Sequence, residues 1–272
     1  MNKFLVLSLC VLLSVGFTSC YAPVDKSGKS SITLENQKTE SEKAAGNYIA
    51  LAFKYINANQ LSTARTKLEQ AQSFEASNPR IYLGYALIYD KEQEEELAIA
   101  SYKTAASLGG GAEVSMHRAL SLYNLSRFRD ASVYFAECMV DTQFDLRALC
   151  FELNGFNEMR LNNVNKAIES FVKATQLNTN MPTSYLSLAN LYIQTGDMDS
   201  GFTQFKKYDQ MAQYIDSVSH TAQSLWIGIQ LANAVGQSSD MNNLVIKLKI
   251  EFQGSNEYKL YKQWSDALGA NQ

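Results

Sequence analysis

Histidine and proline are scarce in this chain of 272 residues, and its charges nearly balance. The only two histidines, His117 and His220, are separated by about a hundred residues, so no local stretch assembles a histidine-based metal cluster or catalytic triad. Three prolines leave few helix breakers, as an all-helical chain requires. The formal net charge of −3 argues against nucleic acid as the main partner, because phosphate binding requires clustered Lys and Arg.

Motifs that bind nucleotides or activate a nucleophile are also missing. The sequence has no P-loop, no dinucleotide-binding fingerprint and no Gly-x-Ser-x-Gly elbow. The triple glycine at 109–111 is not followed by Lys-Ser or Lys-Thr, and it is better explained as a helix terminator. We therefore expect a non-enzymatic protein with no catalytic residues, no metal, no dissociable cofactor and no small-molecule substrate.

One segment of the chain is repeated after 34 residues. When residues 48–71 are aligned with residues 82–105, alanines coincide at three positions: Ala52 with Ala86, Ala64 with Ala98, and Ala71 with Ala105. Small residues at this spacing allow two helices to cross closely, while larger neighbours fill the adjoining holes. A 34-residue period with this pattern is typical of the tetratricopeptide repeat, a helix–turn–helix unit.

The pattern continues along most of the chain and predicts an array of about six units. We expect an all-α superhelical solenoid of tetratricopeptide repeats over residues 43–268, ending in a short capping helix at 256–267 that covers the last unit. The units are expected at about 45–78, 79–112, 112–147, 148–181, 182–215 and 221–252. A solenoid of this kind offers an extended surface for binding another protein.

The N-terminus is predicted to contain a signal peptide followed by a lipid attachment site. Lys3 and the apolar run from Phe4 to Val15 lie within residues 1–19 and are typical of a signal peptide. The end of this stretch, Phe17-Thr18-Ser19-Cys20, resembles the lipobox of bacterial lipoproteins. That resemblance implies cleavage before Cys20 and covalent lipid on its thiol, whereas an ordinary signal peptide and an uncleaved anchor are the alternatives. Because Tyr21 follows the cysteine where an Asp would retain the protein at the inner membrane, we expect anchoring on the periplasmic face of the outer membrane.

Residues 20–42 are predicted to connect this anchor to the solenoid. From Tyr21 onward the segment is rich in Ser, Lys and Glu and shows no sustained hydrophobic period. Such a composition buries too little apolar surface to order itself, so we expect a flexible tether that begins at the lipidated Cys20.

The first helix of each unit is expected to face the concave side of the superhelix, and its apolar residues there form a candidate binding groove. An exposed apolar strip suits an amphipathic helix or an extended apolar segment of a partner. The alternative is that tight winding of the superhelix buries several of these side chains as ordinary core. The predicted groove residues are Ile49, Phe53, Ile56, Leu83, Leu87, Met116, Leu120, Tyr123, Phe156 and Met159.

Cys138 and Cys150 are the two cysteines outside the signal peptide and the lipobox. They are expected near the end of one helix and the start of the next. A disulfide between them is geometrically feasible in an oxidising periplasm, while two small buried thiols are the simpler interpretation.

Beyond the generic repeat, the chain resembles the type IV pilus biogenesis lipoproteins of the PilF/PilW family, the pilotins. The stretches that carry the resemblance are residues 44–71, 97–105, 126–131, 162–182, 224–232 and the closing run LKIEFQGSNEY at 248–258. The resemblance implies a lipid-anchored assembly factor that binds subunits of the pilus secretin, PilQ, and promotes their localisation or multimerisation in the outer membrane. The alternative is a general periplasmic scaffold for envelope or cell-wall assembly enzymes.

Overall fold

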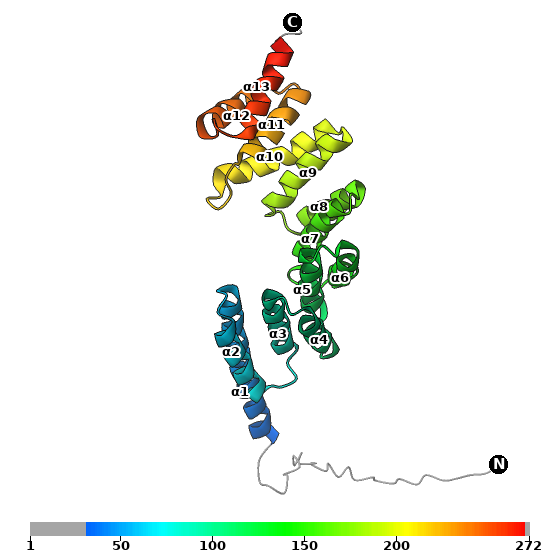
Figure 1. Ribbon diagram of the computed structural model, residues 1–272, viewed down its shortest axis with the longest axis vertical. Helices are drawn as coiled ribbons and strands as arrows, with labels where there is room; N and C mark the ends of the chain where they lie inside the picture. The colour runs from blue at the N-terminus through cyan, green and yellow to red at the C-terminus, as the bar shows by residue number, and fades with distance from the viewer. Residues whose placement is uncertain (1–30, 270–272) are drawn as a thin grey trace, which may run out of the picture.

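The computed structural model describes residues 31–269, and all of the regular secondary structure in them is helical. The helices are stacked along an elongated molecule, with the first and last helices at opposite ends (Figure 1). The predicted all-α solenoid is thereby confirmed. In chain order the helices are α1 (Ser31–Asn57), α2 (Leu61–Phe74), α3 (Pro79–Glu92), α4 (Glu95–Ser107), α5 (Gly111–Asn124), α6 (Phe128–Val140), α7 (Arg147–Arg160), α8 (Val164–Leu177), α9 (Pro182–Thr195), α10 (Met198–Tyr214), α11 (Ala222–Ala234), α12 (Ser238–Glu251) and α13 (Asn256–Gly269).

The helices form six successive pairs, from α1 with α2 to α11 with α12, and α13 follows the last pair. We call the odd-numbered member of each pair its first helix and the even-numbered member its second helix. First helices contact each other across four of the five joints between units, as α1 does with α3 and α3 with α5. Within residues 31–269, second helices of neighbouring units do not pack as closely on one another. The first helices therefore form the inner side of the stack.

Each unit turns from its first to its second helix through one residue in the left-handed backbone region. The N–H of the following residue donates to the carbonyl five residues before it, as Gln60 does to Tyr55 at 2.8 Å and Asp197 does to Tyr192 at 3.0 Å. This geometry is the Schellman termination of a helix, so the chain stops each first helix in the same way. The left-handed residues are Asn59, Gln93, Ser126, Asn162, Gly196 and Gly236.

The triple glycine forms the connection between the second and third units. Gly109 and Gly111 have φ values of +90° and +52°, a region that costs side-chain-bearing residues energy. A side chain at Gly110 would collide with Val114 and with the backbone carbonyl of Ala105. The predicted helix terminator is confirmed: α4 ends at Ser107 and α5 starts at Gly111.

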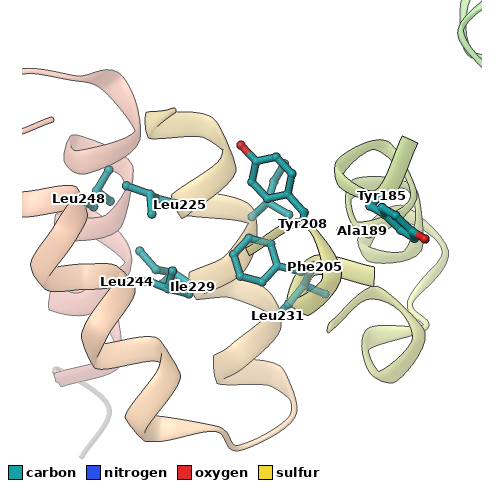
Figure 2. Packing of buried hydrophobic residues seen from close by; sticks show 10 residues of the cluster. Tyr185, Ala189, Phe205, Tyr208, Leu225, Ile229, Leu231, Leu244 and Leu248 are labelled. Atoms are coloured by element: carbon teal, nitrogen blue, oxygen red, sulfur yellow. The ribbon is translucent and has the colours of Figure 1, made fainter. Parts of the chain in front are cut away.

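Small residues occupy the helix crossings, as the repeat predicts. Ala52, Ala64 and Ala71 are fully buried, and their counterparts in the second unit are at most 2% exposed. The largest buried cluster lies at the C-terminal end and runs from α9 to α12 (Figure 2). There Phe205 of α10 points toward α11, and its burial contributes on the order of 2 kcal/mol to folding.

The capping helix is confirmed as α13, two residues longer at its C-terminal end than the predicted 256–267. Its Tyr258, Tyr261 and Trp264 pack against the C-terminal cluster, and Trp264 meets Trp226 of α11 edge-to-face with ring centroids 5.9 Å apart. These aromatic side chains cover the end of the sixth unit, as a capping helix does in a solenoid.

The N-terminal part of the predicted solenoid starts earlier than expected. Helix α1 begins at Ser31, so residues 31–42, predicted as irregular tether, are helical. Their Glu, Gln and Lys residues are good helix formers, and a helix already fixed by packing extends outward at low cost. The signal peptide at 1–19, Cys20 and residues 21–30 lie outside the described residues.

Candidate functional site

Four of the ten predicted groove residues belong to the core. Ile49, Ile56, Leu83 and Met116 are only 1%, 2%, 0% and 3% exposed. The expectation that they form an exposed strip is wrong, because neighbouring first helices pack against each other and cover this face of each helix. The alternative of burial by superhelical winding applies to these four.

The other six predicted residues are half-buried, and most of them also support the core. Phe53 is covered by the guanidinium group of Arg80, whose Cζ lies 5.2 Å from the ring centroid. Tyr123 packs edge-to-face on Phe128 of the same unit, and Phe156 packs in the same way on Phe171. Met159 joins the cluster around Phe171. Because core contacts cover part of each of these side chains, a partner can contact only the part that remains exposed.

Three of the predicted residues meet in one cavity among the first helices of units one to three. Ile56 of α1, Leu87 of α3 and Leu120 of α5 line a hollow of about 380 Å³, together with Leu125. We call it the first-helix hollow. Its volume and these four apolar side chains suit a few apolar side chains of a partner segment. The structure does not bring Tyr123, Phe156 or Met159 into this hollow.

The polar residues of the first-helix hollow are Asn57, Asp90, Lys91, His117, Ser121 and Asn124. Burial lowers the pKa of His117, although the charge of Glu113 acts in the opposite direction. The imidazole is therefore neutral near pH 7, so His117 adds no charge to the hollow. Asp90 accepts hydrogen bonds from the hydroxyls of Tyr102 at 2.6 Å and Ser121 at 2.7 Å, so both of its oxygens are engaged.

The structure also contains a histidine arrangement that sequence reasoning missed. His220 lies between Asp209 and Ser224, with its Nε2 3.1 Å from the Asp209 carboxylate and its Nδ1 3.2 Å from the Ser224 hydroxyl. Asp209 belongs to α10 and Ser224 to α11, so folding of the connection between them brings the three together. No motif in the sequence marks this spacing.

This Ser–His–Asp chain is a structural element, although its connectivity is that of a catalytic triad. Ser224 is fully buried, and its hydroxyl is occupied in the capping box of α11, where it accepts from the backbone N–H of Thr221. A nucleophile needs an accessible hydroxyl beside a substrate site. The chain of hydrogen bonds instead satisfies buried polar groups at the joint between the fifth and sixth units.

Acid should weaken this joint. Burial acts to raise the pKa of Asp209, but hydrogen bonds from His220 and Gln213 and the positive charge of Lys206 outweigh it and lower the pKa from its ordinary value. A carboxylate whose pKa is lower in the folded protein than in the unfolded chain stabilises the fold at pH values above its unfolded-state pKa. That stabilisation is lost as the pH falls through its folded-state pKa. Between about pH 4 and pH 2, the free energy of unfolding should therefore fall more steeply for the wild type than for Asp209→Asn.

Urea denaturation at a series of pH values measures this slope. The exposed Asp216→Asn variant is the matched control and should keep the wild-type slope. Equal slopes for the wild type and Asp209→Asn would show that the buried pair does not contribute to the acid response.

The two remaining cysteines are bridged. Cys138 of α6 and Cys150 of α7 form a disulfide with their Cα atoms 6.2 Å apart, and both are fully buried. The bridge joins the third unit to the fourth and closes over the connection at 141–146. Of the two interpretations of this pair, the structure adopts the disulfide rather than two separate thiols.

Within residues 31–269, no group of three or more His, Cys, Asp or Glu side chains is arranged to hold a metal ion. Over the same residues, no helix combines the length and apolar character needed to cross a bilayer.

Comparison with known proteins extends the repeat assignment. A tetratricopeptide repeat model matches residues 79–108, which form the second unit. Over 260 residues the chain is 27% identical to the type IV pilus assembly protein PilF of Pseudomonas aeruginosa, and the match covers 94% of this chain and 97% of that protein.

Solved structures show the same arrangement of helices. A structure of Pseudomonas aeruginosa PilF has a TM-score of 0.70 at 24% identity, covering 82% of this chain and 99% of the other. A crystal structure of PilW, described as a widely conserved type IV pilus biogenesis factor, has a TM-score of 0.62 at 20% identity, with coverages of 80% and 97%. Over nearly its whole length the chain is therefore similar in sequence to PilF, and it shares with PilF and PilW the fold of a tetratricopeptide-repeat solenoid.

Proposed function

We propose that this protein is a lipid-anchored assembly factor for type IV pili that binds secretin subunits through the first-helix hollow. The observation that carries the proposal is the meeting of the apolar residues Ile56, Leu87 and Leu120 in one cavity. These residues come from three successive units of a chain that is similar to PilF over nearly its whole length. An apolar segment of a secretin subunit that has not yet assembled is the chemical match for such a cavity.

The proposed location follows from the N-terminal sequence. The run Phe17-Thr18-Ser19-Cys20 favours lipid attachment at Cys20, and several acyl chains hold a protein on a membrane far more firmly than one. The anchored protein would face the periplasm from the outer membrane. Labelling with radioactive palmitate tests this step: label should enter the wild type and be absent from Cys20→Ala.

Leu120→Asp should weaken secretin binding by on the order of thirtyfold, which corresponds to about 2 kcal/mol. Leu120 is half-buried and lines the hollow, so a carboxylate there places a charge against the partner's apolar side chains. Leu120 is a sharper test than Phe53, because Arg80 covers the Phe53 ring and would pair with a carboxylate introduced there. Binding of purified secretin fragments is measured by titration calorimetry.

Leu177→Asp is the matched control, since Leu177 is 42% exposed on α8, outside the hollow. It should bind secretin as the wild type does. In cells, a photo-crosslinking amino acid at Leu120 identifies the partner directly. Crosslinks to cell-wall or envelope assembly enzymes, together with normal heat-resistant secretin multimers in a deletion strain, would refute the proposal in favour of a general periplasmic scaffold.

A further inference from the structure

The joint between the second and third units is the least extensively packed joint of the described array. Only one buried apolar residue of the third unit, Val114, enters the cluster formed by Leu83, Tyr102 and their neighbours in the second unit. The next joint differs, because α6 and α7 pack broadly and are bridged by the disulfide. Apolar packing therefore holds the second unit to the third only weakly.

Cavities lie on both sides of the contact between the second and third units. The first-helix hollow is on one side. A second cavity of about 260 Å³ lies on the other, between α4 and α6, where its walls include Ile99 and Val133. Asp90, Ser121 and Leu125 line both cavities, so they form the partition between them. A contact with empty space on either side can change its angle without forcing atoms of a close-packed core to overlap.

Polar bridges replace the missing apolar packing. Ser121 of α5 donates to Asp90 of α3 at 2.7 Å, and the Asp90 carboxylate also holds the buried Tyr102 hydroxyl. Two ion pairs cross the same joint: Arg80 with Glu113 at 3.1 Å, and Arg127 with Glu95 at 2.8 Å. Their side chains are between 30% and 50% exposed, so dissolved salt screens them.

The geometry points to a hinge at this joint, with the Asp90–Ser121 hydrogen bond as its latch. The connection that would bend is Gly109–Gly111, which already contains two left-handed glycines. The disulfide-bridged third and fourth units form the rigid body on one side, and the first two units form the other. Opening would separate Leu87 on α3 from Leu120 on α5 and so change the width of the first-helix hollow. The hinge itself does not depend on which partner the hollow binds.

Two matched pairs of spin labels test the hinge. Lys103 and Ala136 lie on α4 and α6, across the proposed hinge, whereas Ala136 and Glu169 lie on α6 and α8, across the disulfide-bridged joint. All three positions are exposed, and both pairs are 33 residues apart. Attaching the nitroxides to an encoded keto amino acid leaves the native disulfide intact. The width of each inter-spin distance distribution is then measured by electron paramagnetic resonance in the full folded protein.

We expect the hinge pair to give a distribution about twofold broader than the control pair, and to broaden further in about 1 M NaCl. Ser121→Ala should broaden the hinge pair at low salt while leaving the control pair unchanged. The salt titration is done on the labelled protein with Ser121 unchanged, so it still tests the hinge if Ser121→Ala folds poorly. Equal widths for the two pairs, or equal broadening of both by salt, would overturn the inference.

Discussion

Reduction of the Cys138–Cys150 disulfide should lower the free energy of unfolding by about 3 kcal/mol. The bridge closes a loop with a sequence separation of 12 residues, and reduction would return conformational freedom to the unfolded chain. The same change removes a covalent link between α6 and α7, in the middle of the array. Because each unit of a solenoid relies on its neighbours, a weaker central joint lowers the stability of both halves.

Urea denaturation with and without dithiothreitol measures the effect of the bridge. The double variant Cys138→Ala/Cys150→Ala is the control, since it should unfold at a lower urea concentration than the oxidised wild type and should not respond to reductant. Identical midpoints for the oxidised and reduced wild type would show that the bridge does not stabilise the fold.

Ala52→Trp should unfold the first unit, at a cost of about 3 kcal/mol or more. Ala52 is fully buried and packs with Ile49, Ala64 and Leu68 at the crossing of α1 and α2. An indole ring at this position would force the two helices apart and break the close packing of the cluster. The damage should remain local, because a terminal unit of a solenoid contacts only one neighbour.

Hydrogen exchange followed by mass spectrometry resolves the effect by helix. Amides of α1 and α2 should exchange much faster in Ala52→Trp, while those of α7 to α12 keep their protection. Ala50→Trp is the matched control two residues away on the same helix, since Ala50 is exposed and the new side chain would extend into solvent. Wild-type protection of α1 in Ala52→Trp would contradict the assignment of this alanine to the helix crossing.

The features that the sequence predicts well are those with a local physical cause. The 34-residue spacing of Ala52 and Ala86 marks helix crossings because only small side chains let two backbones approach closely. Gly196 marks a turn because the left-handed conformation that ends a helix favours glycine. The order of the units, the boundaries between them and the capping helix follow from such signals, whereas the start of the first helix at Ser31 does not.

The candidate groove was predicted less well, because burial on the inner face depends on contacts between units. Ile49 and Phe53 are both apolar residues of α1 at neighbouring turns, yet one is 1% exposed and the other is half-buried. Their difference depends on how closely α3 approaches α1, which no residue of α1 determines alone. The hollow at Ile56, Leu87 and Leu120 arises where three first helices leave space between them.

By itself, the sequence determined the all-α repeat architecture, the boundaries between successive units and a set of apolar residues on the first helices, since each depends on residues within one 34-residue unit. Only the tertiary structure decided which of those residues are core and which face a cavity, that Cys138 meets Cys150, and that His220 joins Asp209 to Ser224. These outcomes depend on the angle at which one unit stacks on the next. That angle is set by packing between units and is not encoded in the periodicity of either unit.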